Sequence, residues 1–370
     1  MPIAIQPFRE QHQPAVKAFN RRLKAATSDR GLVFYDEANP EWLPKVEGNA
    51  LYNEYFVALE DGEVRGAYAL KYERLFLRGH GEYKVACYHH PLSEGIVDRK
   101  YSTVGSLLLR DALWREPMLY ALGMGGLDRP LPQMLKAMGW TLRFVPFYFR
   151  VVHPFRFLRG MSVLRDVWWK RGLMDMAAFS GGGWAITAVQ SIKRRGGLNP
   201  GSFDIVEVEE FGDWADDLWF DAKDEYGLAS VRDRATLARL YPSDDRDLKK
   251  LCVSQHGKPV GWAVVGERRK DAKFGTLKVG SIVDCWARPE NAGAVILAAT
   301  RALERQGIDL IVTNQSHKRW GQALEDSGFF QAESNFIFAV SKKHAALIEQ
   351  FDWSEFHLTR ANGDGLPRNF

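Results

Sequence analysis

Cysteine is scarce in this chain of 370 residues. The three cysteines, Cys87, Cys252 and Cys285, stand far apart, with no CxxC pair and no spacing typical of metal ligands. An odd and dispersed set excludes a disulfide framework and favours a reducing compartment. Each cysteine also lies in an apolar stretch typical of a strand, where a thiol is usually buried and inert. We therefore expect no metal site and no cysteine nucleophile.

Long apolar runs are missing too. A membrane-spanning helix needs about 18 or more consecutive apolar residues, and the chain has no such run. The nearest candidate, residues 172–192, contains Asp175 and the glycine triplet 181–183, which disfavour a membrane helix. The N-terminal residues have no apolar core of a signal peptide. We expect a cytoplasmic protein.

A strong charge of one sign is the third feature that the chain lacks. The 50 Lys and Arg residues exceed the 46 Asp and Glu residues by a net charge of only +4. That imbalance is too small to indicate nucleic-acid binding by itself. The apolar fraction of 46% is typical of a protein with real cores, and the length exceeds what one core usually supports. Two globular domains are therefore the expected organisation.

What the chain does contain is an internal repeat. Residues 57–70 and 253–265 each have the pattern of a strand, a glycine turn and a second strand with a glycine four residues after the first. Helices and strands then follow in the same order in both halves, and the second helix of each ends in glycine and an aromatic residue. The predicted elements cover residues 105–114, 118–122 and 145–152 in the first half and 293–303, 308–313 and 335–340 in the second. Similarity over so long a period indicates duplication.

Both halves thus share the order hairpin, strand, helix, strand, helix, strand. The basic stretch between them carries eight Lys and Arg residues against two Asp. The predicted organisation is a first domain over residues 1–152, a helical connector over 153–201, a second domain over 202–345 and a C-terminal tail over 346–370.

This order resembles the GNAT acyltransferase superfamily, over residues 50–150 and again over 205–342. The resemblance implies an α/β fold with two tandem GNAT-like domains, each a mixed, mostly antiparallel sheet flanked by helices. It also implies that two central strands separate to expose an acyl-CoA thioester, with acetyl-CoA as the expected donor. Tandem lobes are similar to the FemAB-like branch of the superfamily as well.

The specific part of the resemblance is the stretch from Glu94 to Leu109, which looks like the family's strand, pyrophosphate loop and following helix. A diphosphate needs free backbone N–H groups at a helix N-terminus and a glycine that permits close approach. Gly105 opens the helix, and hydroxyl groups and positive charge lie beside it. The predicted cofactor-binding residues are Arg99, Lys100, Ser102, Thr103, Val104, Gly105 and Ser106. The loop departs from the family pattern because only one glycine remains.

Candidate bases lie on the strand ahead of this loop: His89, His90 and Glu94. A histidine or glutamate with a pKa near neutrality could take a proton from an acceptor. In a strand, His89 and His90 face opposite sides, so only one can point into the cleft. A structural role, as a hydrogen-bonded histidine or a salt-bridged glutamate, is the alternative for each of them.

The family's tyrosine acid would fall at Leu135 and Leu324, so it is absent from both halves. In the second half Glu290 stands beside the glycine of the loop and would repel a phosphate, and Asp284 is the counterpart of the candidate bases. We expect the second lobe to be structural or to bind the acceptor.

The resulting hypothesis is acyl transfer to an amine or hydroxyl of a small molecule or polymer precursor, in the modification of cell-surface polysaccharide or peptidoglycan-type polymers. One alternative is a FemAB-like transferase that uses aminoacyl-tRNA, because RNA binding depends on charge and the connector is basic. Another is a degenerate GNAT pair that acts as a binding or scaffold protein. The basic and aromatic residues at 156–195 also suggest peripheral contact with the inner face of an anionic membrane.

Overall fold

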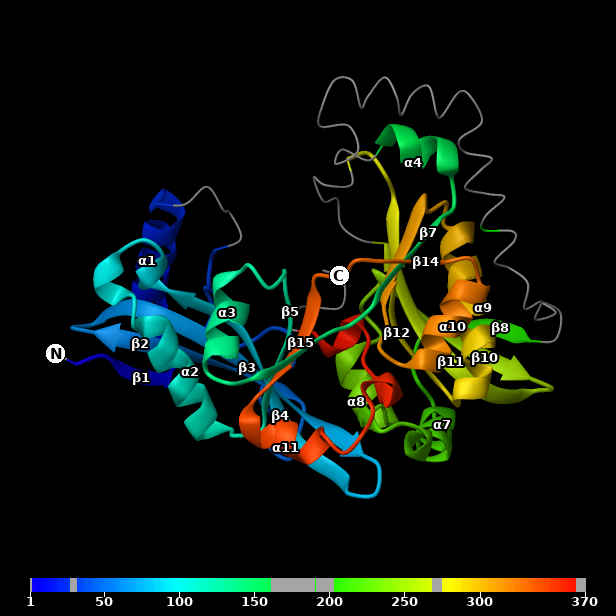
Figure 1. The fold of residues 1–370 in the computed structure, drawn as a ribbon, viewed down its shortest axis with the longest axis horizontal. Helices are drawn as coiled ribbons and strands as arrows, with labels where there is room; N and C mark the ends of the chain where they lie inside the picture. The colour runs from blue at the N-terminus through cyan, green and yellow to red at the C-terminus, as the bar shows by residue number, and fades with distance from the viewer. Residues whose placement is uncertain (1, 27–31, 161–189, 191–202, 268–274, 364–370) are drawn as a thin grey trace. The chain divides into compact units, whose positions relative to one another are not determined.

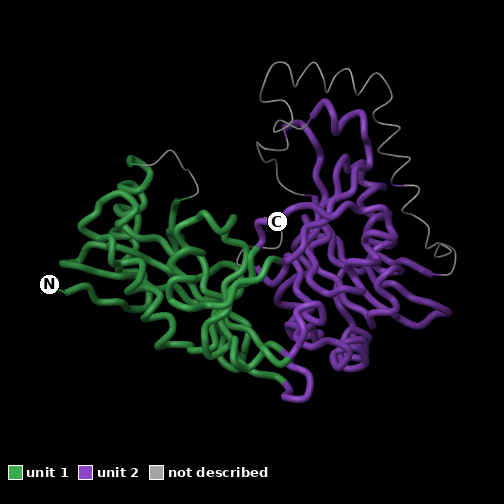
Figure 2. The backbone as a smooth tube through the Cα atoms, in the orientation of Figure 1, with its two compact units in different colours: residues 1–75, 82–144, 337–350 green, residues 76–81, 145–336, 351–370 purple. Residues whose placement is uncertain are grey.

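The structure is a computed structural model that describes residues 2–26, 32–160, 190, 203–267 and 275–363. The chain forms two compact units, drawn in green and purple in Figure 2. Unit 1 comprises residues 1–75, 82–144 and 337–350, and unit 2 comprises residues 76–81, 145–336 and 351–370. In the described part of the chain no helix is long and apolar enough to cross a bilayer.

A mixed sheet forms the centre of unit 1, with the strand order β1-β2-β3-β4-β5-β15-β6 (Figure 1). The pairs β1–β2, β2–β3 and β15–β6 are antiparallel, and β4–β5 is parallel. The strands are β1 (Ala4–Pro7), β2 (Tyr52–Glu60), β3 (Glu63–Leu77), β4 (Gly81–Ser93), β5 (Leu119–Met124), β6 (Thr141–Phe144) and β15 (Phe336–Val340).

Helices cover both faces of this sheet. On one face, α1 (Gln13–Ala26) buries Val16, Phe19 and Leu23 against alternate strand residues such as Val57 and Ala67. On the other face, α2 (Val104–Arg115) and α3 (Pro130–Ala137) pack on Phe56 and Tyr68 and their neighbours. A further helix, α11 (Lys342–Ile348), follows β15. The alternation of strand side chains between two apolar cores is what a sheet covered on both faces requires.

Unit 2 contains a second mixed sheet, with the order β14-β7-β13-β12-β11-β10-β8. Its strands are β7 (Phe147–Val151), β8 (Asp204–Val208), β10 (Leu248–Gln255), β11 (Lys258–Glu267), β12 (Val279–Ala287), β13 (Leu310–Asn314) and β14 (Phe330–Ala332). Its helices are α4 (Pro154–Gly160), α7 (Trp214–Ala222), α8 (Arg234–Leu240), α9 (Ala292–Arg305) and α10 (Lys318–Asp326). Two short strands, β9 (Leu228–Ser230) and β16 (Phe356–His357), pair in parallel.

The predicted fold class is confirmed, and the two hairpins of the predicted repeat share local features. The two hairpin turns have the same backbone, with Asp61 and Gly62 in the left-handed region in one repeat and His256 and Gly257 in the other. Glycine is needed again on the second strand of each hairpin. A Cβ on Gly66 would lie 2.7 Å from Val104 Cγ1, and a Cβ on Gly261 would lie 2.5 Å from Val295 Cγ2. The glycine therefore lets the strand approach α2 in one unit and α9 in the other.

One strand of each sheet comes from the other repeat. β7, the last strand of the first repeat, pairs with β13 and β14 in unit 2. β15, the last strand of the second repeat, pairs with β6 in unit 1 and lies next to β5. The domain boundaries expected from the sequence, at residues 152 and 345, therefore differ from the compact units, since the sequence order alone places each strand in its own repeat.

The predicted tail over 346–370 also differs from the structure. Residues 356–362 are buried in unit 2 and include β16 and a 3-10 turn, η10 (Arg360–Asn362). Of the predicted connector, residues 153–160 are described and form α4, and most of the remainder lies outside the described residues. Of the predicted membrane-contacting stretch, 156–195, only residues 156–160 and 190 are described, and the rest lies outside the described residues.

Candidate functional site

The central parallel strands of unit 1 separate at one point. β4 and β5 are paired at Ala86–Leu119 and Cys87–Tyr120, and β4 then runs on to Ser93. Helix α2 begins beside the end of β4, because both Val104 Cγ1 and the Leu92 carbonyl lie close to Gly66. The separation of β4 and β5 and the first turn of α2 thus belong to one site.

The chain between β4 and α2 is held by its own side chains. Ser93 Oγ accepts from the Gly95 amide at 3.1 Å, and the Asp98 carboxylate accepts from the Lys100 amide at 2.9 Å. A Cβ on Gly95 would lie 2.5 Å from the Tyr101 carbonyl oxygen, so this position has room for glycine alone. These contacts fix the loop without using the amides that follow it.

The first turn of α2 has free donors. Among the described residues, none accepts a hydrogen bond from the amides of residues 103–106, while the Ser106 hydroxyl donates to the Thr103 carbonyl at 2.7 Å. A Cβ on Gly105 would meet only Met134 Sδ, at 3.8 Å, so internal packing does not require glycine there. Arg99, Lys100, Ser102 and Thr103 are exposed around this turn. Free amides, a helix N-terminus and two cations suit a phosphate.

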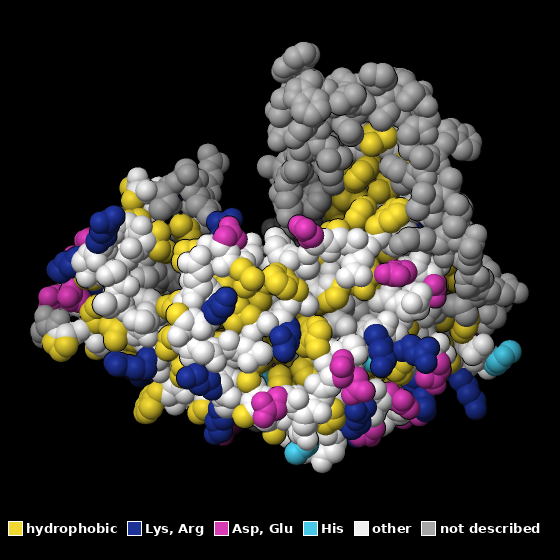
Figure 3. Space-filling view, in the orientation of Figure 1, with side chains coloured by type: hydrophobic (Ala, Val, Ile, Leu, Met, Phe, Trp, Pro, Cys, Tyr) yellow, Lys and Arg dark blue, Asp and Glu magenta, His cyan; other side chains and the backbone are white. Residues whose placement is uncertain are grey.

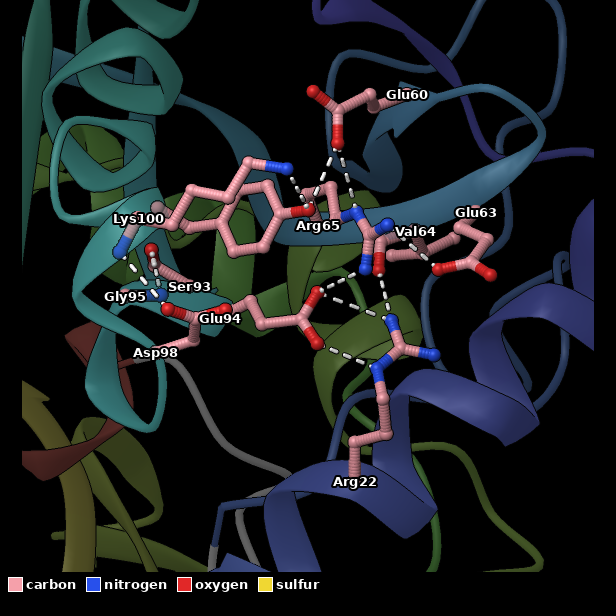
Figure 4. A network of polar contacts seen from close by, with 11 residues as sticks. Arg22, Glu60, Glu63, Val64, Arg65, Ser93, Glu94, Gly95, Asp98 and Lys100 are labelled. Carbon is pink, nitrogen blue, oxygen red and sulfur yellow. Dashed lines mark hydrogen bonds and ion pairs between the residues drawn. The ribbon is translucent and has the colours of Figure 1, made fainter.

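Glu94 lies at the centre of an ion-pair network (Figure 4). Arg22 from α1 donates to its carboxylate through Nη2 at 3.1 Å, and Arg65 from β3 donates through Nη1 at 3.0 Å. Arg65 also pairs with Glu60 and Glu63, and its guanidinium lies 4.6 Å from the centre of the Tyr101 ring. The network ties α1, the β2–β3 hairpin and the loop between β4 and α2 together.

This environment does not suit Glu94 as a general base. Burial alone would raise the pKa of Glu94, but the hydrogen bonds and charges of Arg22 and Arg65 outweigh burial and lower it. A carboxylate held by two arginines is a weak proton acceptor at neutral pH. The structural alternative, a salt-bridged glutamate, is the one that the contacts describe.

Tyr88 and His89 lie one and two residues beyond Cys87, the last residue of β4 that pairs with β5. In unit 1, five buried polar side-chain atoms of the described residues have no partner, and three of them are Tyr88 Oη, His89 Nδ1 and His89 Nε2. The other two are Trp42 Nε1 and Asn53 Oδ1. His89 is 3% exposed and Tyr88 is 1% exposed. Buried polar groups usually have a hydrogen-bond partner, so these two side chains are the candidates on β4 for contact with a substrate.

These two side chains point to opposite faces of the sheet. Tyr88 packs in the core under α2 and α3, whereas the His89 ring lies 6.5 Å from the ring of Tyr35. Burial lowers the pKa of His89 well below its usual value, and the charges of His90 and Lys71 lower it further, so the imidazole is neutral at pH 7. Burial raises the pKa of Tyr88, which keeps its hydroxyl protonated.

His90 is placed differently from His89. Its φ of +51° lies in the left-handed region, which is unusual for a residue with a side chain and marks an irregularity in β4. Its Nε2 lies 2.6 Å from the Val33 carbonyl oxygen, and its ring packs 5.2 Å from Tyr35. His90 is therefore engaged by its own chain, and His89 is the histidine left without a partner.

The end of β5 and the loop after it are built from unusual backbone. Gly123, Met124, Gly125 and Gly126 all have positive φ angles. The loop leads into α3, whose Leu135 is fully buried at the position where the resemblance implies a tyrosine.

Sequence reasoning missed Tyr88 as a candidate, although the neighbouring histidines were found, because nothing in the pattern showed that its hydroxyl would be buried without a partner.

The corresponding position in unit 2 is occupied by hydrogen bonds. Asp284 on β12 accepts from Arg232 Nε at 2.7 Å and from the Tyr241 hydroxyl at 2.8 Å. Leu324, the second position where the resemblance implies a tyrosine, is also buried. Across the described ranges, no three His, Cys, Asp or Glu side chains are grouped so as to hold a metal ion, and the three cysteines are free and buried.

The sequence matches no protein-family model and no curated protein. The fold, however, is similar to solved structures. One is an Enterococcus faecalis protein described as a probable N-acyltransferase, with 9% identity and a TM-score of 0.52 over 92% of this chain and 73% of that one. Another is Saccharomyces cerevisiae N-myristoyltransferase with bound myristoyl-CoA and inhibitors, with 10% identity and a TM-score of 0.51 over 92% and 80%.

A GNAT-type N-acetyltransferase of Anabaena variabilis gives a TM-score of 0.52 at 10% identity, over 91% of this chain and 72% of that one. Identities this low inform about architecture and leave activity to be argued from the site. Together with the two mixed sheets and the separated central strands, they show that this chain has the fold of GNAT-type acetyltransferases.

Proposed function

We propose that this protein is an acyltransferase that moves an acyl group from acyl-CoA, bound in unit 1, to an amine or hydroxyl acceptor. The observation that carries the proposal is that unit 1 combines free donors at the first turn of α2 with two unpartnered polar side chains on β4, one on each face of the sheet. The amides of residues 103–106 have no acceptor among the described residues, and Tyr88 and His89 are buried without partners where β4 and β5 part. Similar solved structures include an N-myristoyltransferase with bound myristoyl-CoA.

In this proposal the diphosphate of the donor binds at the first turn of α2. The free amides of Val104, Gly105 and Ser106 donate to phosphate oxygens, and Arg99 and Lys100 add positive charge. The thioester arm then runs between β4 and β5. Because β4 leaves β5 beyond Cys87, backbone N–H groups that point into the gap can donate to the thioester oxygen as negative charge develops there.

His89 is the proposed base. Burial weakens His89 as a base, but its imidazole is neutral and unpartnered, and the acceptor's proton becomes strongly acidic as nitrogen or oxygen attacks the carbonyl carbon, so the ring can accept that proton while the carbon–sulfur bond breaks. Tyr88, on the opposite face, is the proposed hydrogen-bond donor to the departing sulfur, in place of the tyrosine that is missing at Leu135. Glu94 and His90 are proposed to hold the loop and the strand.

Isothermal titration with acetyl-CoA and with a long-chain acyl-CoA tests donor binding. We expect the wild type to bind one of them and the Gly105→Glu variant to lose that binding, because the carboxylate would face the phosphates. Binding that survives Gly105→Glu unchanged, or no binding by the wild type, would contradict the proposal. The second outcome would favour the scaffold alternative.

Release of CoA thiol in the presence of small amines, amino sugars and polymer precursors tests the acceptor class and the residue roles. We expect His89→Ala and Tyr88→Phe to slow release at least tenfold while donor affinity stays within about twofold. Tyr68→Phe is the matched control on the neighbouring strand, since the Tyr68 hydroxyl is already bound by Asp111. A cytoplasmic role in modifying cell-surface polymers is part of this proposal and depends on the acceptor found.

The FemAB-like alternative, with an aminoacyl-tRNA donor, rests on the basic connector, most of which lies outside the described residues. On the face drawn in Figure 3, positive and negative side chains are interspersed over the described residues. Filter binding over a range of salt concentrations decides this alternative. Salt-sensitive tRNA association would support it, and no association would remove it.

A further inference from the structure

The central strands of unit 2 separate as those of unit 1 do. β12 and β13 are paired in parallel at Val279–Leu310, Gly280–Ile311 and Ser281–Val312, and β12 then runs on to Ala287. The Thr313 hydroxyl donates to the Ile282 carbonyl at 2.9 Å at the point of separation. Unit 2 therefore has the strand geometry in which the GNAT fold would place a second thioester.

The C-terminal segment, residues 356–362, lies in this separation and is bonded to both sides of it. On the β12 side, the Thr359 hydroxyl donates to Asp284 Oδ1 at 2.9 Å. On the β13 side, Thr359 forms a β-bridge with Gln315, which directly follows the strand. The Ser316 amide donates to the Leu358 carbonyl at 3.2 Å, and the Leu358 amide donates to Ser316 Oγ at 2.8 Å.

The segment also fills the space with apolar and aromatic contacts. Phe356, Leu358 and Ala361 are each at most 3% exposed. The His357 ring lies 5.0 Å from Tyr226, 5.2 Å from Trp286 and 5.4 Å from Trp320, measured between ring centres. Further on, the Asn362 amide donates to Ser230 Oγ. The segment is thus packed as core.

The approach to α9 has a negative rim. Arg288, just before the helix, pairs with Asp221, Glu225 and Glu290, whose carboxylates outnumber it. All three acidic side chains are at least 44% exposed. A diphosphate at the start of α9 would face these carboxylates, whereas the start of α2 has Arg99 and Lys100.

We propose that the second thioester site of this fold has become a site for an extended peptide, and that residues 356–362 of the same chain occupy it. The groups that recognise the peptide are the carboxylate of Asp284, the backbone of Gln315, and the amide and hydroxyl of Ser316. Since unit 1 is the proposed donor site, the protein binds one acyl-CoA per chain. This last point rests on the proposed function, and occupancy of the site by the segment does not.

Titration of the full chain with acetyl-CoA tests the stoichiometry. We expect one site in the wild type, none in Gly105→Glu, and one in the matched variant Gly293→Glu, which places the same charge at the first turn of α9. Two sites in the wild type, or loss of binding in Gly293→Glu with retention in Gly105→Glu, would overturn the proposal. No binding by the wild type would refute the proposed function instead, and the following measurement would then decide the occupancy by itself.

Hydrogen exchange followed by mass spectrometry tests the segment without any ligand. We expect the amides of residues 356–362 to exchange as slowly as those of β12, and Thr359→Val to speed their exchange about tenfold through loss of the bond to Asp284. Ser354→Ala, just ahead of the segment, should leave the exchange unchanged. Exchange of the wild-type segment as fast as an exposed loop, or no effect of Thr359→Val, would show that the segment does not occupy the site.

Discussion

At the scale of single residues, the glycines of this chain have two different roles. Gly66 and Gly261 are required by packing, because a side chain would collide with Val104 and Val295. Gly105 is not required by packing or by its backbone angles, since a Cβ there would have only Met134 Sδ within 4 Å and its φ is not positive. The sequence shows all three as glycines in a repeat, and only the contacts separate the packing role from a role toward a ligand.

Gly66→Ala is expected to destabilise the protein by about 1–3 kcal/mol, because the new carbon would lie 2.7 Å from Val104 Cγ1 and 3.1 Å from the Leu92 carbonyl oxygen. Gly105→Ala should instead leave stability unchanged or raise it by up to about 1 kcal/mol, since alanine favours a helix. Urea unfolding at pH 7 measures both. Equal effects of the two substitutions would contradict the distinction between them.

Glu94→Gln is expected to cost roughly 2 kcal/mol at pH 7, because charge-assisted bonds to Arg22 and Arg65 are lost. The pKa of Glu94 is lowered by folding, so its stabilisation is present above the unfolded pKa of about 4.3 and is lost as the pH falls through the folded value. The variant should therefore lose less stability than the wild type below about pH 4.3. Glu82→Gln, which breaks an exposed pair with Arg74, is the control and should cost less than about 1 kcal/mol.

At the scale of elements, the order of helices and strands could be predicted from the sequence, and their pairing could not. Hairpin turns, helical spacing and the glycine–aromatic ends are local signals, so the repeat was visible. The exchange of β7 and β15 between the two sheets has no local signal in the sequence, because these two strands are counterparts with the same apolar pattern. The Glu94 network was hidden for the same reason, since Arg22 is 72 residues away in sequence.

A fragment of residues 1–152 is expected not to unfold cooperatively, because it lacks β15 and contains β7 without its partners in unit 2. A chain in which residues 337–350 follow Phe144 through a two-residue glycine turn should fold better, since the Val145 amide and the Phe336 carbonyl are already 2.8 Å apart. Near-UV circular dichroism and thermal melting compare the two. A sharp transition in the first fragment and none in the second would contradict the strand exchange.

At the scale of the whole molecule, buried histidines make stability depend on pH. Burial lowers the pKa of His317 in unit 2 and of His344 in unit 1 to about 4. The unfolded chain, with a histidine pKa of about 6.5, then binds more protons than the folded chain between about pH 6.5 and 4, so stability falls with pH across that window. His317 also faces the cations Lys318 and Arg319, and His344 bonds Tyr83 and the Leu119 carbonyl.

Each of the two histidines is expected to reduce stability by roughly 3 kcal/mol once fully charged below about pH 4, relative to pH 7. Urea unfolding at pH 7, 6 and 5 checks the slope. His344→Asn should make the fall of the unfolding free energy with pH shallower between about pH 6.5 and 5, because His317 alone of the two then contributes. His80→Gln, at an exposed turn, should leave that fall as in the wild type. A slope that is the same in wild type and His344→Asn would contradict the assignment.

The strand exchange has a consequence for how the protein is made. The sheet of unit 1 cannot be completed until β15 has left the ribosome, nearly 200 residues after β6. At roughly 5–20 residues per second, translation leaves the first sheet open between β5 and β6 for on the order of 10–40 s. During that interval the nascent chain exposes unpaired strand edges, so synthesis of this protein is expected to depend on a chaperone that shields them until the second repeat arrives.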